Sequence, residues 1–545
     1  MSGRRTARAI DTERSETGPA LPQALLDPTL YPHAAPAPQL IETHISWVVL
    51  AGEYAYKFKK PVRFPFLDYS TRALRRAACC TEVALNARWA PDLYLGVSEL
   101  VASAAGWRLD VAGTALEPAV RMRRFDRREE LDALVVRAAV APEELATLGS
   151  ELAQWQAAAP AVATDSTLGR PAAALGAAEE NLATLRASAA TAQHPRLAQL
   201  VAWVNATHAA LEPTLAARRA AGRVRECHGD LHTRNVVRWR GRLTPFDGID
   251  FDAGLRFIDA ASDVAFLCMD LERLGRADLC HAFLDAWFAA SGDYAAARPL
   301  PWFLCYRALV RAKVGALRAG QLTAGSPAAA SAAGECADFL GLAAHYATRS
   351  PGRLVLTHGV SGSGKSWLAA RLVTALPAIR LRADVERKRL AGLEPAAHTG
   401  SSPDAGLYSA AATQRTYQRL AVAASALVAG GFDTIVDATF LDAAERARFA
   451  ALAHAAGAPL TILDCTAPRA LLAARVVSRS GDPSEATLAV LERQLARPTA
   501  LAERERRGAV TVDTAQSPDV SALAAQLKAA AVRPGDGPRG AAPVS

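Results

Sequence analysis

The chain has 545 residues, of which 51% are apolar, and its formal net charge is +8. That length exceeds one ordinary hydrophobic core, so we expect two or three domains. The eight cysteines include no C-x-x-C pair, which argues against a zinc ribbon and favours reduced thiols in the cytoplasm. The first 18 residues lack an apolar core, and no apolar run reaches the roughly 18 residues of a membrane span. The sequence therefore predicts a soluble protein without a secretory signal.

Lysine is rare in this chain. Of the 62 basic residues only seven are lysines, and four of these are Lys57, Lys59, Lys60 and Lys365. A lysine kept where arginine is the usual cation indicates a need for a compact point charge.

The N-terminal part predicts a tail followed by a small sheet. Residues 1–38 are rich in Ala, Pro and Arg and weakly patterned, so we expect a loose tail. Residues 45–50 and 54–59 read as two strands around a turn, and the period of two places Lys57 and Lys59 on one face. Further strands are expected at residues 106–112 and 117–125.

A helix is predicted over residues 70–90, and it carries Glu82 among several arginines. Kinase-like folds hold the α- and β-phosphates of a nucleotide with a strand lysine paired to a helix glutamate. We therefore assign Lys57 and Glu82 to nucleotide binding. The plainer interpretation makes Lys59 and Lys60 edge charges and Glu82 a solvated helix residue. No G-x-G-x-x-G loop accompanies these strands.

The next segments predict a hinge and a helical region. Residues 120–125 would lie where the adenine of a nucleotide binds. Residues 127–219 are rich in Ala and Leu with helical spacing, interrupted by prolines. We expect these helices to cover an acceptor site.

Residues 228–235 read H-G-D-L-H-T-R-N, in which an Asn follows an Asp after five positions. That is the spacing of the kinase catalytic loop. The Asp, here Asp230, accepts the proton of the attacking hydroxyl, and the Asn, here Asn235, reaches a magnesium ion on the phosphates. A second acid must hold the same metal, and either Asp250 or Asp252 meets that need. The plainer interpretation is a surface turn.

The H-G-D run resembles the aminoglycoside phosphotransferase and choline kinase group. The segments AYKFKKPV, FLDYST, LNARWAPDLYL and FDGIDFDAGLRFIDAASDVAFLCMDL are similar to bacterial proteins in which such a domain is fused to a P-loop ATPase. This resemblance implies a bilobed, protein-kinase-like α+β domain over residues 39–347. It leaves the choice between Asp250 and Asp252 open, since Asp252 stands where the family usually has Gly, and we assign the metal to Asp250. It also implies that Asp259 and Asp263 brace the catalytic loop.

A second nucleotide site is predicted further along the chain. The apolar strand 353–358 runs into G-x-x-x-x-G-K-S, followed by a helix over residues 367–376. In this Walker A pattern the backbone N–H groups surround the β-phosphate, the lysine reaches the β- and γ-phosphates, and the serine binds magnesium. The strand 431–437 ends in Asp437, the expected partner of the magnesium ion. The nucleotide-binding residues are Gly359, Val360, Ser361, Gly362, Ser363, Gly364, Lys365 and Ser366.

The segment 381–390 resembles the zeta-toxin and polynucleotide-kinase group of P-loop kinases. The resemblance implies that Asp384 activates an acceptor hydroxyl and that Arg387 binds the substrate. Glu386 and Arg389 are expected to be surface charges of the same helix. Residues 471–485 look like a lid in which Arg475 and Arg479, four residues apart, share a helix face.

Together these features predict an α/β three-layer P-loop domain with a parallel sheet over residues 352–530, and a disordered tail at 531–545. The leading hypothesis is a bifunctional phosphotransferase that uses ATP and Mg²⁺, with a small-molecule hydroxyl acceptor or a nucleic-acid 5′ end as substrate. A second hypothesis makes the kinase-like domain a non-catalytic, nucleotide-binding regulator of the P-loop kinase. A third hypothesis is that the chain is an aminoglycoside resistance kinase, but a resistance enzyme has no evident need for the P-loop half.

Overall fold

The structure, a computed structural model, describes residues 21–64, 67–395, 397, 406–478, 486–497 and 500–529. The chain forms two compact units. Unit 1 comprises residues 1–144, 154–188 and 205–274, and unit 2 comprises residues 145–153, 189–204 and 275–545. The predicted tail at 531–545 and the first 20 residues of the predicted N-terminal tail lie outside the described residues.

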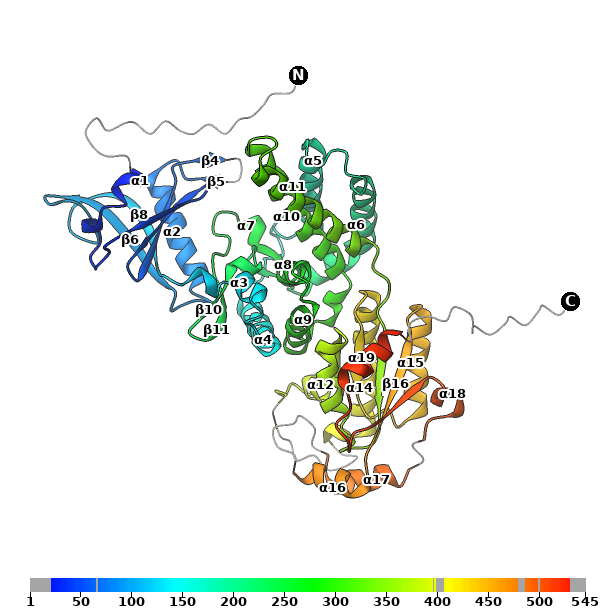
Figure 1. The fold of residues 1–545 in the computed structure, drawn as a ribbon. Helices are drawn as coiled ribbons and strands as arrows, with labels where there is room; N and C mark the ends of the chain where they lie inside the picture. The colour runs from blue at the N-terminus through cyan, green and yellow to red at the C-terminus, as the bar shows by residue number, and fades with distance from the viewer. Residues whose placement is uncertain are drawn as a thin grey trace. The chain divides into compact units, whose positions relative to one another are not determined.

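Unit 1 begins with a six-stranded antiparallel sheet in the order β1-β2-β3-β8-β6-β7, against which α2 packs. Figure 1 shows α2 lying along this sheet. The predicted strands and helix are confirmed, whereas β1 and β6 were not predicted. The bounds are β1 Gln39–Glu42, β2 Ser46–Ala51, β3 Tyr54–Lys59, α2 Arg72–Asn86, β6 Tyr94–Ser103, β7 Gly106–Leu109 and β8 Thr114–Arg123.

The described part of the predicted tail is not loose. Residues 21–38 contain the helix α1 (Leu21–Ala24) and the 3₁₀ turn η1 (Pro28–Leu30). Leu25, Leu30 and Tyr31 are buried in the same apolar cluster as sheet residues such as Tyr56 and Phe58. The prediction was wrong here because the apolar residues are few and irregularly spaced, and their burial depends on the distant sheet.

The rest of unit 1 carries the H-G-D loop between short strands. The strands β10 and β11 form one antiparallel pair and β9 and β12 another. Residues 248–252 form a loop. The bounds are β4 Arg63–Phe64, β5 Leu67–Asp68, α3 Leu131–Val136, α4 Pro142–Ala158, α5 Pro171–Ala187, α6 Leu197–Ala220, β9 Val224–Glu226, β10 Val236–Trp239, β11 Arg242–Pro245, α7 Ala253–Arg256, β12 Phe257–Asp259 and α8 Ala260–Arg273; α4 and α6 extend into unit 2.

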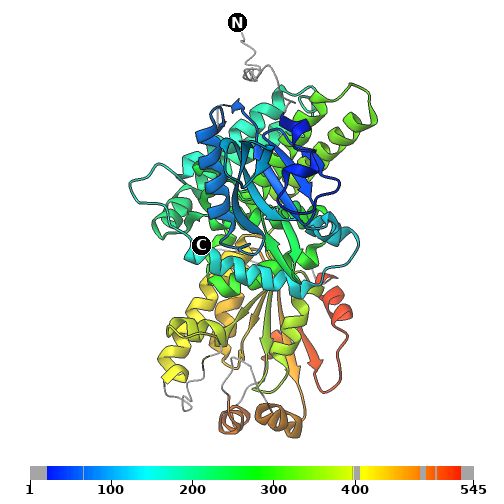
Figure 2. The same ribbon diagram turned by 90° about the vertical axis from the view of Figure 1, so that its left-hand side faces the viewer.

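Unit 2 is built on a five-stranded parallel sheet in the order β14-β15-β13-β16-β17. On one face α12 and α19 form an apolar core with the strands, and on the other α14 packs against β14, β15 and α15. Figure 2 shows the strands side by side with helices on both flanks. This is the predicted three-layer α/β arrangement. The bounds are β13 Leu354–His358, α12 Lys365–Ala375, β14 Ile379–Arg382, α13 Ala383–Leu390, α14 Ala410–Ala429, β15 Thr434–Asp437, α15 Ala443–Ala455, β16 Leu460–Thr466, α16 Arg469–Val477, α17 Leu488–Leu495, α18 Glu503–Arg506, β17 Ala509–Asp513 and α19 Val520–Ala529.

Three helices that precede the parallel sheet in sequence belong to the same compact unit: α9 (Ala277–Ser291), α10 (Leu300–Gln321) and α11 (Pro327–Ala347). The 3₁₀ turn η4 (Tyr294–Ala297) connects the first two. The predicted domain boundary between residues 347 and 352 stays a prediction, since unit 2 already begins its longest segment at Gly275. Among the described residues, no helix combines the length and the apolar character that a membrane crossing requires.

Gly352 joins α11 to the parallel sheet at a point with no room for a side chain. Its N–H donates to the Val428 carbonyl at 2.9 Å, and a Cβ atom would lie 2.1 Å from the Phe432 carbonyl oxygen. We expect Gly352→Ala to lower the free energy of unfolding by about 1–3 kcal/mol, the usual effect of overpacking a buried position. The measurement is the thermal denaturation of the full chain.

The matched control for this prediction is Gly334→Ala. Gly334 lies on α11, where a Cβ atom would meet nothing within 4 Å. Alanine has the higher helix propensity, so this variant is expected to be more stable by about 1 kcal/mol. Equal transition midpoints for the two variants would contradict the close packing of Gly352.

Candidate functional sites

In unit 1 a buried glutamate on α2 joins two lysines of β3. Lys57 Nζ lies 2.9 Å from Glu82 Oε1, and Lys59 Nζ binds Glu82 Oε2. Strand alternation explains the arrangement, because residues two apart point to the same face of the sheet. The side chains of Glu82 and Lys59 are fully buried. The interpretation of Lys59 as an edge charge and of Glu82 as a solvated residue is therefore wrong, and the Lys57–Glu82 pair is present as predicted.

The two lysines keep Glu82 ionised. Burial favours the neutral acid, but the charges of Lys57 and Lys59 hold the pKa of Glu82 below its ordinary value. Burial also opposes the charge of Lys57, yet Asp247 and Glu82 raise the pKa of this lysine well above its usual range. At neutral pH Lys57 is therefore protonated and Glu82 is ionised, so the pair is held by opposite charges.

Two aspartates from the loop after β11 complete the cluster. Asp247 Oδ1 lies 2.5 Å from Lys57 Nζ, and Asp250 Oδ2 lies 2.7 Å from Lys59 Nζ. Asp252 instead caps α7, where its Oδ1 accepts the N–H of Gly254. Of the two acids that the sequence left open, the structure thus brings Asp250 to the lysines. The sequence analysis did not identify Asp247 as a site residue. Its position in Phe246-Asp247-Gly248, directly after a strand, could have indicated it.

The H-G-D loop is braced from α8. Both oxygens of Asp263 accept backbone N–H groups of the loop, from His228 at 3.2 Å and Gly229 at 2.9 Å. The bracing role of Asp263 is confirmed, whereas Asp259 caps α8 and binds Arg218. His228 Nε2 donates to the Phe246 carbonyl at 2.9 Å, and burial lowers the pKa of this imidazole, so it stays neutral. The loop is consequently tied to the start of the Asp247–Asp250 segment.

Asp230 and Asn235 lie together within this loop. The side-chain amide of Asn235 donates to the Asp230 carbonyl at 2.9 Å and to its carboxylate at 3.1 Å. The Asp230 side chain keeps 38% of its surface exposed, so a substrate can reach it. Asp230 and Asn235 therefore belong to one hydrogen-bonded turn, and the Asp230 carboxylate of this turn is partly open to solvent.

A cavity of about 830 Å³ lies at the predicted adenine hinge. Near it, the rings of Phe125 and Phe246 meet edge to face, with centroids 5.0 Å apart. Most of the side chains that line this cavity are charged, so adenine binding here stays a prediction. The lining residues are Gln39, Leu50, Gly52, Glu53, Arg123, Arg124, Phe125, Asp126, Arg127, Trp239 and Arg240.

In unit 2 the Walker A segment forms the turn between β13 and α12. Gly359, Gly362 and Gly364 have φ values of 135°, 82° and 80°, which favour glycine. A Cβ atom on Gly362 would lie 2.6 Å from the Leu472 carbonyl oxygen. Lys365 begins α12, and its Nζ donates to the Val360 carbonyl at 2.7 Å. The turn therefore has the tight backbone that phosphate binding by N–H groups requires.

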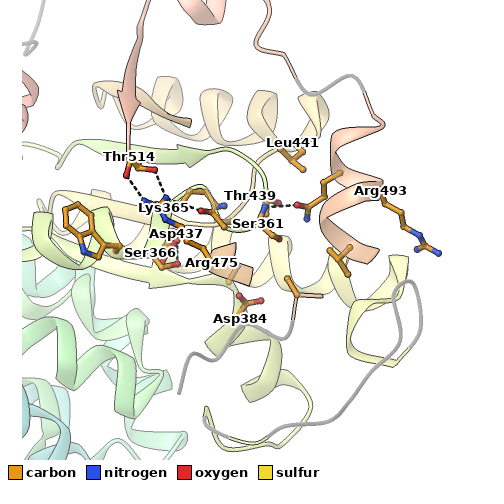
Figure 3. A pocket seen from close by; sticks show the side chains of 18 of the residues that line it. Ser361, Lys365, Ser366, Asp384, Asp437, Thr439, Leu441, Arg475, Arg493 and Thr514 are labelled. Carbon is orange, nitrogen blue, oxygen red and sulfur yellow. Dashed lines mark hydrogen bonds between the residues drawn. The ribbon is translucent and has the colours of Figure 1, made fainter. Parts of the chain in front are cut away.

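Ser366 and Asp437 meet at the head of α12. Ser366 Oγ donates to Asp437 Oδ1 at 3.0 Å (Figure 3). Burial raises the pKa of Asp437, against the opposing effects of Arg380, Ser366 and Lys365. A hydroxyl and a carboxylate are hard oxygen donors of the kind that Mg²⁺ prefers, so these residues fit the predicted metal.

A cavity of about 1010 Å³ extends from this point. Asp384 and Arg387, both on α13, line it together with Ser366 and Asp437, and Figure 3 shows Asp384 among the lining side chains. Arg387 Nη1 donates to the Leu407 carbonyl at 2.9 Å, and its guanidinium lies 5.0 Å from the ring centre of Tyr408. Among the described residues, the Nε atom of this buried arginine has no hydrogen-bond partner.

The two arginines of the predicted lid have different outcomes. Arg475 on α16 donates to Gly362 O and to both oxygens of Thr514, so it lies against the Walker A turn. Arg479 lies outside the described residues. The sequence missed α17 and the residues after it, where Arg493, Gln494 and Arg497 line the cavity. Gln494 Oε1 accepts the N–H of Ser361 at 2.7 Å.

Glu386 is not the surface charge that the sequence suggested. It has no exposed surface, and its two oxygens bind Arg389 and Arg419, each at 3.0 Å. Asp384 and Arg387 occupy the opposite side of α13. The prediction failed because the helix is covered by residues distant in sequence.

Comparison with known proteins identifies both halves. Residues 94–300 match the profile described as "Phosphotransferase enzyme family", and residues 354–501 match the one described as "AAA domain". Uncharacterised proteins of Mycobacterium tuberculosis strain H37Rv and Mycobacterium bovis are 33% identical over 450 residues, covering 82% of this chain and 87% of theirs. The chain belongs to the same family as these mycobacterial proteins. It is a kinase-type phosphotransferase in which a phosphotransferase-family domain precedes a P-loop kinase-like domain.

Solved structures share smaller parts of the chain. A choline/ethanolamine kinase family protein from Mesorhizobium loti is 14% identical, with a TM-score of 0.38, and the match covers 59% of this chain and 93% of that one. A sugar kinase from Janibacter sp. HTCC2649 is 23% identical, with a TM-score of 0.27, over 33% of this chain and 96% of that one.

The buried Asp437 predicts a pH dependence. Magnesium requires the ionised carboxylate, and burial raises the pKa of this group above the ordinary value of about 3.9. We expect the magnesium-dependent gain in ATP affinity at the P-loop site to be lost as the pH falls, beginning above the pH at which an ordinary Asp protonates. Titrating ATP binding with Mg²⁺ and with EDTA checks this. Asp437→Asn is expected to bind with little pH dependence; equal profiles for both proteins would contradict the assignment.

Proposed function

We propose that the chain transfers the γ-phosphoryl group of ATP to hydroxyl acceptors at two magnesium-dependent sites. The observation that carries this proposal is the Ser366–Asp437 pair, 3.0 Å apart at the head of α12, beside an open cavity that also contains Asp384. Oxygen donors, a phosphate-binding turn and a carboxylate facing one space are the components that phosphoryl transfer needs. We expect the reaction to take place in the cytoplasm.

At the P-loop site each residue has a separate role. The N–H groups of residues 360–364 and the Lys365 ammonium bind the β- and γ-phosphates. Ser366 and Asp437 would hold Mg²⁺, and the bound ion would supply positive charge beside the phosphates. Asp384 accepts the proton of the acceptor hydroxyl, and Arg475, which contacts the turn, faces charge on the transferred group.

At the unit 1 site we assign phosphate binding, metal binding and proton acceptance to side chains. Lys57, oriented by Glu82, binds the α- and β-phosphates, and Asp230 accepts the acceptor proton. Asn235 and Asp250 hold the metal, with Asp247 as a further oxygen donor beside Lys57. An intact lysine–glutamate pair is the arrangement found in active kinases. This observation favours catalysis over a purely regulatory domain.

Arg387 indicates the chemical class of the P-loop acceptor. Its guanidinium is nine-tenths buried beside the cavity, and its Nε atom lacks a partner among the described residues. A buried donor without a partner is costly, and an anionic oxygen of the substrate would satisfy it. We therefore expect a hydroxyl compound that also carries a carboxylate or phosphate. Acidic sugars and nucleic acids with a 5′-hydroxyl end both meet this description, and an acceptor screen separates them.

Lys365→Ala and Asp384→Asn test the P-loop site. Loss of the ammonium is expected to abolish ATP binding at this site, whereas Asp384→Asn keeps binding and lowers transfer by a factor of about 10²–10⁴, because proton acceptance is lost. Equilibrium binding and phosphate transfer are measured on the full chain. Loss of ATP affinity in the Asp384 variant would make this residue a structural or metal-binding group instead.

Asp230→Asn and Asp250→Asn test the unit 1 site in a chain whose P-loop is inactivated by Lys365→Ala. Asp230→Asn is expected to lower transfer by about 10²–10⁴ with ATP affinity nearly unchanged, since this carboxylate faces the acceptor. Asp250→Asn is expected to weaken both magnesium-dependent ATP binding and transfer. Asp252→Asn, which alters a helix cap, is the matched control. Undiminished transfer by the Asp230 variant would leave unit 1 a regulatory role.

A further inference from the structure

Helix α9 supports the P-loop site from outside the P-loop sequence. Residues 277–291 lie within the stretch that matches the phosphotransferase family, yet α9 packs against α12 and β14 in the same compact unit (Figure 1). Three sets of contacts connect α9 to elements that carry the proposed catalytic residues; two are made by α9 itself and one lies between α13 and α14, which it binds.

The first contact is at the C-terminal end of α9. Arg389 of α13 donates to the carbonyls of Ala289 and Ala290, and Arg419 of α14 donates to the Gly292 carbonyl at 2.6 Å. The last carbonyls of a helix lack partners within it and carry the negative end of the helix dipole. The two guanidinium groups therefore bind at the C-terminal end of α9, where their positive charge meets the negative end of the dipole and their N–H groups meet free carbonyls.

The second contact makes this anchoring specific. The buried carboxylate of Glu386 bridges Arg389 and Arg419, so it fixes both guanidinium groups. Glu386 and Arg389 are one turn apart on α13, as are Asp384 and Arg387 on the cavity side. Because a helix turns as a rigid body, the position of the first pair determines that of the second. The α9 anchor thereby sets the acceptor-binding face.

The third contact reaches the magnesium-binding end of the site. Asp285 Oδ1 on α9 accepts the N–H of Arg380 on β14 at 2.5 Å. Arg380 Nη1 in turn donates to the Ser366 carbonyl at 3.3 Å. A short path of hydrogen bonds therefore runs from α9 to the residue that is expected to hold the metal.

We propose that α9 is a positioning element of the P-loop site: it holds α13 through Arg389 and β14 through Asp285. Phosphate transfer by the P-loop half then depends on a helix of the phosphotransferase-family half. The inference rests on the proposed function of the P-loop site.

Arg389→Met in the full chain tests the inference, with Asp230→Asn added so that the P-loop site is measured alone. Methionine retains much of the apolar stem but cannot bind the carbonyls of α9. We expect ATP affinity within about twofold of the parent and magnesium-dependent ATP hydrolysis about tenfold slower, because small displacements of a catalytic group cost rate more than binding. Amide hydrogen exchange in residues 383–390 is expected to accelerate. Arg389→Lys, which keeps a charge that can reach Glu386, is expected to recover part of the rate.

Arg448→Met is the matched control, since Arg448 pairs with Glu445 on the exposed side of α15. Hydrolysis by Arg389→Met equal to that of this control would overturn the inference. If Arg389→Met does not fold, Asp285→Leu replaces it; this variant keeps the branched shape of the side chain and removes the oxygen that accepts the Arg380 N–H. It is expected to slow hydrolysis several-fold while ATP affinity in EDTA is unchanged, and an unchanged rate would overturn the inference. Absence of P-loop hydrolysis in the parent itself, unaffected by Lys365→Ala, would instead contradict the proposed function.

Discussion

A carboxylate buried away from water must be neutralised by cations that lie beside it, and each site is arranged around one such group. In unit 1, Glu82 joins Lys57 and Lys59 and so links α2 to β3. In unit 2, Glu386 joins two arginines and so links α13 to α14. Removing one partner of a buried ion pair typically costs about 3–5 kcal/mol. The elements that carry the proposed catalytic groups are consequently fixed by charge as well as by apolar packing.

In the proposed function the two sites would bind phosphate in different ways. The P-loop site would use backbone N–H groups, which are placed by glycines such as Gly362 and need no ordering of a side chain. The unit 1 sequence has no G-x-G-x-x-G loop, so phosphate binding there would depend on the charge of Lys57, which Glu82 orients. Phosphate binding in unit 1 would therefore be more sensitive to the neighbouring charges of Asp247 and Asp250.

The sequence predicted the site features that depend on residues close together in the chain. It missed the features that depend on contacts between residues far apart in the chain. The Walker A turn and the H-G-D loop are short patterns in which spacing alone defines the chemistry, and both form as expected. The burial of Glu386 could not be predicted, because it depends on α14, whose Arg419 binds Glu386 from 33 positions further along the chain. Asp247 was overlooked because a second acid, Asp250, follows within the same loop. Arg493, which lines the cavity, was missed because it lies on α17, beyond the segment in which the sequence pointed to Arg475.

The packing of α9 bears on how such a chain is inherited. If the two halves had been joined recently as independent modules, either could be exchanged for a homologue at the linker before β13. Here a P-loop half transferred at that point would leave behind the carbonyls that bind Arg389 and Arg419. We therefore expect viable recombinants to exchange sequence at a point near Gly275, or to inherit both halves together. The P-loop half would then share its evolutionary history with the phosphotransferase-family half.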